Sequence, residues 1–318
     1  MNTENPNSSN PQKPLALIFG IVNAEKRNIK FLYVYAVFSG LISLTIPLGI
    51  QTIIGYVMAG RLNTSWFFLS LLITLCVLLA GLTRLAQLSI IDSIQRKLFI
   101  RFSMIFKEKI LSFKNVVSET ITQRTSYFMD IVTLQKSLSK LLIDFTGKLL
   151  QAVFGLLLLA VYHPFFLVFG IIVTLVVYLV LKYTWKRGFE TSRCESNFKF
   201  KTFNAITKMA HAGNKEVYVD QIDEYVNEYA KSRNAHFGIL YRQAWLGILT
   251  KVLFTAFMLV IGSFLLVEQR ISLGQFLASE ILIITLLDAI EKLILTVENL
   301  YDCGVSIEKL NLISETDD

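Results

Sequence analysis

The chain has 318 residues, of which 53% are hydrophobic, and a formal net charge of +7. This proportion of apolar sequence, gathered in long uncharged runs, indicates an integral membrane protein and excludes an ordinary soluble domain. Membrane proteins collect lysine and arginine in their cytoplasmic loops, so the positive charge does not indicate a nucleic-acid partner, and we expect none. The three cysteines are far apart and show no metal-ligand spacing.

The first 14 residues are rich in Asn, Pro and Ser and lack the basic and apolar regions of a signal peptide. We expect residues 1–14 to be a disordered cytoplasmic tail. Residues 15–22 form an apolar run that is too short to span a bilayer. They are predicted to lie along the membrane interface, with a loosely ordered linker as the alternative.

Two uncharged segments follow and predict the first two membrane spans, at about residues 31–59 and 63–83. Pro47 lies within the first segment and should kink its helix, because proline removes a backbone donor and leaves a carbonyl unpaired. The turn residues 60–63 separate the two spans.

Residues 84–148 carry charges every few positions, yet their apolar residues recur at helical spacing. The recurring residues are Ile90, Ile91, Ile94, Leu98, Phe102, Ile105 and Phe106. This pattern predicts an amphipathic helix that continues span two into the cytoplasm. A break rich in Ser, Thr and Asn follows at 113–125, and a second helix is predicted over 129–140.

The 33 residues from 149 to 181 contain no charged side chain. One straight helix of this length would measure roughly 50 Å, which exceeds the ~30 Å hydrocarbon core of a bilayer. The step His163-Pro164 disfavours helical geometry, so we predict a hairpin of two spans, 149–162 and 165–181. Basic residues flank both ends and place them in the cytoplasm.

Residues 182–242 repeat this design with helical patterning, a break at 211–214 and a second helix from 215 to 233. Spans five and six are predicted at 244–267 and 271–290. A helical pattern of growing polarity continues to residue 312, and residues 313–318 are expected to form a C-terminal tail.

Each long loop contains eleven basic residues, whereas the outer turns of spans one–two and five–six contain one apiece, Arg61 and Arg270. This asymmetry predicts that both termini and both loops are cytoplasmic. The expected fold is therefore all-α, with six transmembrane helices and two long helical cytoplasmic loops, in the inner or plasma membrane.

Four stretches carry a resemblance to a known family. Residues 129–135 are similar to its Asp-x-x-x-hydrophobic-Gln stretch, and residues 162–164 resemble its outer turn. Residues 272–276 resemble its entry to span six, and residues 306–310 its segment before the nucleotide-binding domain. In this order and spacing, residues 15–312 resemble the transmembrane domain of ATP-binding-cassette (ABC) exporters of the type I fold.

The resemblance implies a half-transporter that forms a twelve-span dimer, with the two cytoplasmic breaks acting as coupling helices that dock on ATPase domains. The candidate coupling residues are Asn115, Glu119, Arg124, His211, Asn214 and Glu216. The chain departs from the family pattern at Tyr127, where many relatives carry Arg.

The sequence contains no GxxxxGK[ST] motif, and a P-loop cannot hold phosphates without that turn and its lysine. We therefore expect the chain alone not to be an enzyme and to carry no cofactor. The resemblance implies ATP and Mg²⁺ on a partner ABC ATPase subunit, a second copy or another half-transporter as dimer partner, and membrane lipid around the spans.

Five acidic residues fall within about 80° of one another on a helical wheel of the sixth helix. They are Glu280, Asp288, Glu291, Glu298 and Asp302. Lys251 of span five lies at a depth similar to that of Asp288, so we predict a buried salt bridge, with substrate contact as the alternative. The lower acids Glu298 and Asp302 are expected to form a solvated face.

Glu280 has no basic partner in sequence and is a candidate for the substrate cavity, consistent with a cationic or polar cargo. A hydrogen bond to Ser or Thr of a neighbouring span is the alternative. Gln51 and Thr52 either line a pathway or satisfy the backbone freed by Pro47, and we favour the second. The three histidines show no ligand spacing and are expected at the surface.

The leading interpretation is a transport subunit that moves an unidentified substrate outward by alternating access, driven by ATP hydrolysis on a separate chain. A regulatory or scaffold membrane subunit of the same fold is one alternative. An ion-coupled secondary transporter that uses Glu280 and Asp288 is another. A chain whose ATPase domain followed residue 318 is the last.

Overall fold

The computed structural model describes residues 26–60, 64–112, 128–162 and 164–314. Its helical elements are α2 (Lys26–Ser43), α3 (Thr45–Met58), α4 (Thr64–Ser112), α6 (Met129–Lys140), the π-helix η1 (Leu141–Phe145), α7 (Thr146–Tyr162), α8 (Pro164–His211), the 3₁₀-helix η2 (Glu216–Tyr218), α9 (Val219–Val267) and α10 (Leu273–Ser314). The described residues contain no strand, which agrees with the predicted all-α class.

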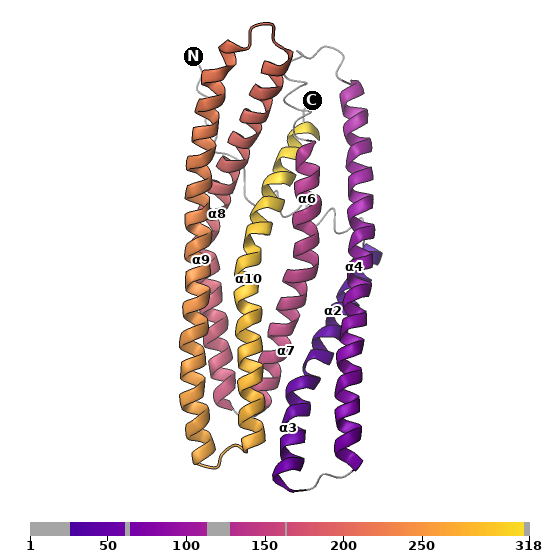
Figure 1. The fold of residues 1–318 in the computed structure, drawn as a ribbon, viewed down its shortest axis with the longest axis vertical. Coiled ribbons are helices and arrows are strands. Elements are labelled where there is room, and N and C mark those ends of the chain that lie inside the picture. Colours follow the sequence, from indigo (N-terminus) through magenta and orange to yellow (C-terminus); the bar gives the residue numbers. More distant parts are fainter. Residues whose placement is uncertain (1–25, 61–63, 113–127, 163, 315–318) are drawn as a thin grey trace.

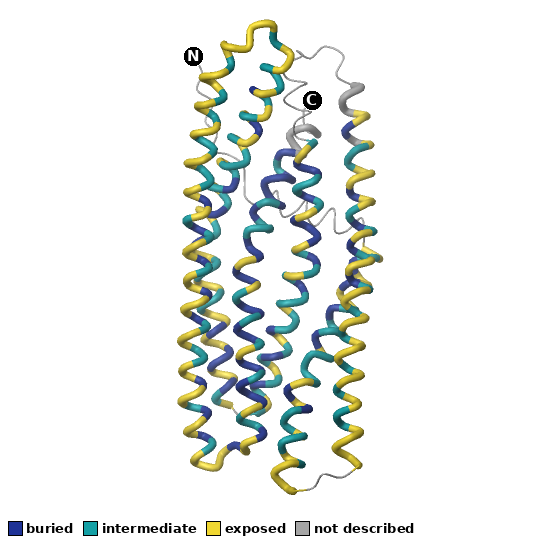
Figure 2. The backbone as a smooth tube through the Cα atoms, viewed as in Figure 1, coloured by how far each residue is buried: buried dark blue, intermediate teal, exposed yellow. Residues whose placement is uncertain are grey.

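The helices form an elongated bundle with α10 at its centre (Figure 1). Helix α10 contacts α3, α6, α7, α8 and α9. Helices α8 and α9 pack along each other on one side of α10, and α2, α3 and α4 lie on the other side. Figure 2 shows that buried positions follow α10 along most of its length, whereas the outer faces of α4 and α9 are exposed.

The first span is broken where Pro47 predicts a kink. Helix α2 ends at Ser43 and α3 begins at Thr45, so the break lies one turn before the proline. Pro47 has no N–H to donate to the carbonyl of Ser43, and its ring crowds that carbonyl. The predicted kink is therefore present.

Helix α4 runs without interruption from the second predicted span into the charged segment that follows it, as the sequence predicts. Four of the residues that recur at helical spacing, Ile91, Ile94, Leu98 and Phe106, are buried in one hydrophobic cluster. The cluster also contains Ile131 and Leu134 of α6 and Ile307 of α10. With Ile29 and Leu32 of α2, it joins four helices that are far apart in the sequence.

The hairpin predicted at residues 163–164 is consistent with the observed elements, since α7 ends at Tyr162 and α8 begins at Pro164. Helix α6 matches the predicted helix over 129–140. The π-helix that joins α6 to α7 was not predicted, because an extra residue in a helical turn leaves no clear mark in the hydrophobic pattern. The first predicted break, at 113–125, lies outside the described residues, as do the tail 1–14 and the interfacial segment 15–22.

Two local motifs fix the outer turn between α9 and α10. Arg270 N–H donates to the carbonyl of Leu265 (2.9 Å), and Gln269 has a left-handed backbone (φ 57°), which is the Schellman ending of a helix. Ser272 Oγ then accepts from Gln275 N–H (3.2 Å), and Gln275 Oε1 accepts from Ser272 N–H (2.9 Å). This capping box starts α10 within the 272–276 stretch.

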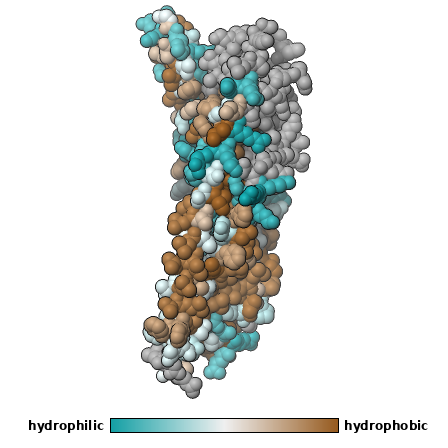
Figure 3. Space-filling model, turned by 90° about the vertical axis from the view of Figure 1, so that its right-hand side faces the viewer, coloured by the Kyte–Doolittle hydropathy of each residue, from teal (hydrophilic) through white to brown (hydrophobic). Residues whose placement is uncertain are grey.

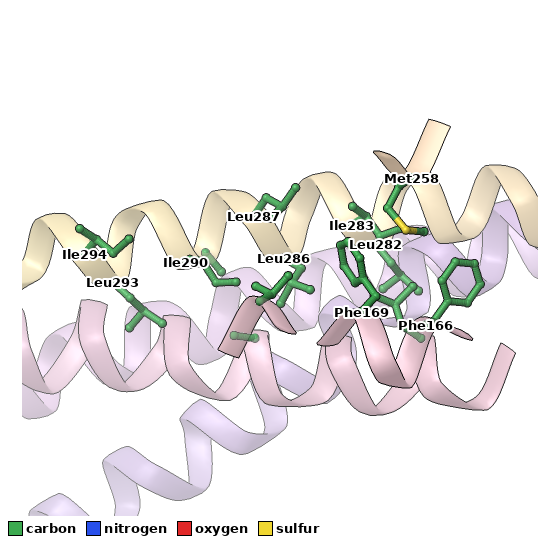
Figure 4. Packing of buried hydrophobic residues seen from close by; sticks show 14 residues of the cluster. Phe166, Phe169, Met258, Leu282, Ile283, Leu286, Leu287, Ile290, Leu293 and Ile294 are labelled. Carbon is green, nitrogen blue, oxygen red and sulfur yellow. The ribbon is translucent and has the colours of Figure 1, made fainter. Parts of the chain in front are cut away.

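A second hydrophobic cluster holds the membrane half of the bundle together. Figure 4 shows Leu282 of α10 beside Phe166 and Phe169 of α8, and Leu286 and Ile290 follow it along α10 in the same cluster. Because all five side chains are buried, the packing fixes α10 between the hairpin of spans three and four and the neighbouring helix α9.

Five helical segments are long and apolar enough to cross a membrane: Lys26–Met58, Thr64–Glu108, Met129–Tyr162, Pro164–His211 and Glu216–Val267. Figure 3 shows hydrophobic side chains over the lower part of the bundle and hydrophilic ones above them. The chain therefore has the properties of a membrane protein. The sixth predicted span, 271–290, overlaps the first part of the central helix α10, which is not among these five segments.

Helix α8 approaches α10 closely at Gly188. A Cβ atom on Gly188 would stand 2.5 Å from Cζ of Tyr301. Tyr301 is completely buried and its hydroxyl accepts a hydrogen bond from Gln243, so the ring is not free to move aside. Only glycine fits without displacing this contact.

We expect Gly188→Ala to lower the free energy of unfolding by about 1–3 kcal/mol, the usual cost of overpacking, as measured by denaturant unfolding in detergent. Gly238→Ala on α9 is the control, because no atom lies within 4 Å of its added Cβ. Its stability should stay the same or rise slightly. Equal loss in both variants would contradict the packing argument.

Candidate functional site

The acidic face of α10, composed of Glu280, Asp288, Glu291, Glu298 and Asp302, turns toward α8 and α9. Glu291 meets Lys251 of α9, Glu298 lies 3.7 Å from Arg233 of α9, and Asp302 accepts from Ser192 of α8 at 3.4 Å. The helical wheel therefore grouped the acids correctly. The side chain of Glu298 keeps 37% of its exposure, in agreement with the expected solvated face. Asp302 does not, because it is largely enclosed against Ser192 of α8.

The predicted pair in the membrane half is present. Lys251 Nζ lies 2.5 Å from Oδ1 of Asp288 and 3.1 Å from Oε2 of Glu291. The side chains of Lys251 and Asp288 keep 37% and 46% of their exposure in the single chain, so the expectation that the pair is buried is wrong for the isolated subunit. Glu291 was not predicted as a partner, although it lies one turn beyond Asp288 on the same face.

A double-mutant cycle tests this contact. We expect Lys251→Ala to destabilise the protein more than Lys251→Ala combined with Asp288→Ala, because the single change leaves two carboxylates without their cation. The coupling should be about 1 kcal/mol, as for polar contacts in other membrane proteins, measured by unfolding in detergent. A cycle between Lys251 and the distant Asp92 should give no coupling, and additive effects at Asp288 would argue against the pair.

Glu280 lies in the membrane half of α10 and is 9% exposed. Its Oε1 atom has no hydrogen-bond partner among the described residues and faces Gly262 of α9, where a Cβ atom would stand 3.5 Å from it. The predicted hydrogen bond to Ser or Thr is not present at this atom. The role of Glu280 at a substrate cavity remains a prediction.

Gln51 lines an open cavity of about 540 Å³ between α3 and the start of α10. Its Oε1 accepts a hydrogen bond from the hydroxyl of Tyr162 (2.6 Å), while Thr52 donates to the carbonyl of Leu48 (2.9 Å). Neither side chain satisfies the carbonyl of Ser43 that Pro47 leaves free. The favoured interpretation of Gln51 and Thr52 is therefore wrong, and the cavity-lining alternative agrees with their position.

Polar side chains also join the helices in the half of the bundle beyond the predicted spans. His236 is 1% exposed, and its Nδ1 lies 2.7 Å from Oε2 of Glu195 on α8. Burial acts to raise the pKa of Glu195, but the hydrogen bond with His236 and the charge of Arg233 outweigh it and lower that pKa. The prediction that His236 is a surface residue is wrong, because an isolated histidine gives no sequence signal of its buried partner.

Two of the family-like stretches meet near the cytoplasmic end of α10. Asp130 is 1% exposed, and the charges of Lys309 and Lys199 act on it. Lys309 donates to Ser196 Oγ (2.5 Å) and lies 4.0 Å from the ring centre of Phe200. The sequence singled out both stretches but did not indicate that they are in contact.

Burial dominates the titration of these two groups. It raises the pKa of Asp130 to about 6, against the charges of Lys309 and Lys199, and lowers the pKa of Lys309 to about 8, against the charge of Asp130. An aspartate with a raised pKa binds its proton more tightly in the folded state. Its contribution to stability is therefore complete below pH 4 and is lost as the pH rises to about 6.

We accordingly expect the midpoint temperature of thermal unfolding in detergent to decrease as the pH rises from 4 to 6. The loss of the Asp130 contribution should lower the free energy of unfolding by about 2–3 kcal/mol over this range. Asp130→Asn mimics the protonated acid and should flatten the profile in that range. Asp92→Asn, which alters an exposed acid on α4, should leave the profile unchanged. A profile that Asp130→Asn does not alter would contradict the assignment.

The tip between α8 and α9 holds the second set of candidate coupling residues. Helix α8 ends at His211, and Asn214 Oδ1 accepts from the N–H of Glu216 (3.2 Å) at the start of η2. His211, Asn214 and Glu216 are all exposed, as is Val217 (70%). The other candidates, Asn115, Glu119 and Arg124, lie outside the described residues.

The described residues contain no group of three or more His, Cys, Asp or Glu side chains placed to hold a metal ion. Comparison of the chain with known protein families and with characterised proteins found no match. The functional argument therefore depends on the geometry of the chain itself.

Proposed function

We propose that the chain is the membrane subunit of an ABC-type exporter, which forms a dimer with a second copy or another half-transporter. It moves its cargo outward by alternating access, and ATP hydrolysis on a separate nucleotide-binding chain drives the movement. The substrate enters from the cytoplasmic side of the inner or plasma membrane.

The observation that carries this proposal is the pair of arms formed by α8 and α9. Helix α8 continues from the predicted membrane boundary at residue 181 to His211, about 45 Å at the usual helical rise. Helix α9 returns alongside it, and the tip between them is short, polar and exposed. Rigid arms of this kind can transmit a movement at their tip to the membrane helices.

The outer surface of α4 supports the proposed dimer. No residue is buried in the most apolar 18-residue window of Thr64–Glu108. Its exposed side chains include Phe67, Phe68 and Leu72. A second half-transporter, together with lipid, would cover this apolar helix.

One observation favours a second candidate, an ion-coupled transporter. The carboxylate of Glu280 is buried in a predicted span, and its Oε1 has no partner among the described residues. Buried ionisable groups within membrane spans commonly belong to ion or proton pathways. This alternative gives the long cytoplasmic arms no role, so we rank it second.

The test is gentle purification of the tagged protein from its native membranes, identification of co-purifying chains by mass spectrometry and assay of vanadate-sensitive ATP hydrolysis. We expect a P-loop protein to be recovered. Val217→Ser at the tip should reduce recovery and ATP hydrolysis several-fold, because it removes exposed apolar contact area.

Val226→Ser is the matched control, because this valine is also exposed on α9 but lies away from the tip. It should leave recovery unchanged. Substrate movement that follows an ion gradient without any ATPase, and that Glu280→Gln abolishes, would contradict the proposal and favour the second candidate.

A further inference from the structure

A cavity of about 210 Å³ opens where the predicted membrane spans meet the cytoplasmic half of the bundle. Helices α2, α4 and α7 and the π-helix η1 surround it. Its charged lining residues are Arg84, Asp144 and Lys148. Arg84 follows the end of span two and Lys148 precedes span three, so the cavity lies at the depth of lipid head groups.

The electrostatic balance of this cavity is basic. Arg84 and Lys148 line the cavity with one acid, Asp144, and two charged groups of α10 act on Lys148 from outside the lining, Lys292 by repulsion and Asp288 by attraction. Lys148 donates to Gln151 Oε1 (2.9 Å), a neutral acceptor, and neither base forms an ion pair with a described residue. Like charges held together in this way are stabilised by a bound anion.

A second cavity of about 110 Å³ continues from the first toward the middle of the membrane half. The two share Ser43 and Gln151 in their linings. Apart from Ser43, Gln151 and Thr285, the lining of the second cavity consists of apolar residues and one glycine. These are Leu44, Ile46, Pro47, Gly155, Ile281, Leu282 and Leu286. The combined space thus has a basic end at the membrane border and an apolar end within the span.

We propose that this two-part cavity binds an amphipathic anion, a molecule with a phosphate or carboxylate head group and an apolar chain. The head group lies between Arg84 and Lys148, and the chain extends past Ser43 toward Leu282 and Leu286. The π-helix places Asp144 and Lys148 at the cavity, and π-helical turns often mark functional sites. This charge preference is opposite to the cationic cargo suggested by Glu280.

As a statement about cargo, the inference rests on the proposed function. Binding itself needs no ATPase and can be measured on the isolated chain. Failure of ATP-driven transport would therefore leave the binding result intact, and failure of binding would leave the export proposal to be judged by its own test.

The experiment is native mass spectrometry of the detergent-purified chain with three probes. Phosphatidylglycerol supplies an anionic head and two chains, phosphatidylcholine supplies the same chains with a zwitterionic head, and glycerol 3-phosphate supplies the head alone. We expect one tightly bound phosphatidylglycerol, at least about tenfold weaker phosphatidylcholine and no retained glycerol phosphate. Equal retention of both lipids, or binding of glycerol phosphate as tight as that of the anionic lipid, would overturn the proposal.

The variant Arg84→Gln/Lys148→Gln should weaken phosphatidylglycerol binding by about thirtyfold, because two basic contacts are lost. The matched control is Lys182→Gln/Arg187→Gln, which removes the same charges from exposed positions at the same membrane border on α8. It should retain the lipid. Equal weakening of phosphatidylglycerol binding in both double variants would show that any basic residue at the membrane border attracts the head group. It would overturn the proposal of a specific site.

A variant that removes a negative charge instead of two positive ones provides a second test, which applies even if the double variant does not fold. Asp144→Asn removes the only acid that lines the basic cavity among the described residues. It should tighten binding of phosphatidylglycerol by about fivefold. Unchanged or weaker binding in this variant would overturn the proposal.

Discussion

The structure depends on how the charges of α10 are satisfied. This helix lies at the centre of the bundle, yet one face carries five acids. Helices α8 and α9 supply Lys251, Arg233 and a serine hydroxyl to that face. These contacts fix the rotation of α10 against α8 and α9.

The same principle operates in the cytoplasmic half with a different set of contacts. Asp130 on α6 and Lys309 on α10 interact within a buried region, and Glu195 on α8 binds His236 on α9. Charged groups thus interact across two pairs of helices, α6 with α10 and α8 with α9, while two hydrophobic clusters hold the rest of the bundle. Interactions of this kind are sensitive to protonation.

The two-part cavity joins a charged lining to an apolar one. It lies beside the break between α2 and α3, where Pro47 interrupts the first span, and beside the π-helix before α7. Both irregularities leave side chains and backbone free to face a ligand. Because the basic and apolar ends lie along one path, the cavity suits a molecule that is itself divided into a charged and an apolar part.

Local spacing or the chemistry of one residue was enough to predict the helices, the kink at Pro47, the hairpin before Pro164 and the common face of the acids. The pairing of Lys251 with Asp288 was also predicted, because their depth can be counted from a shared turn. The helices that the other polar groups meet became known from the three-dimensional packing. In the sequence, 41 positions separate Glu195 from His236, and 179 separate Asp130 from Lys309. The residues that line the two-part cavity come from four or more helices. Their contacts depend on packing angle and helix rotation, which no local pattern specifies.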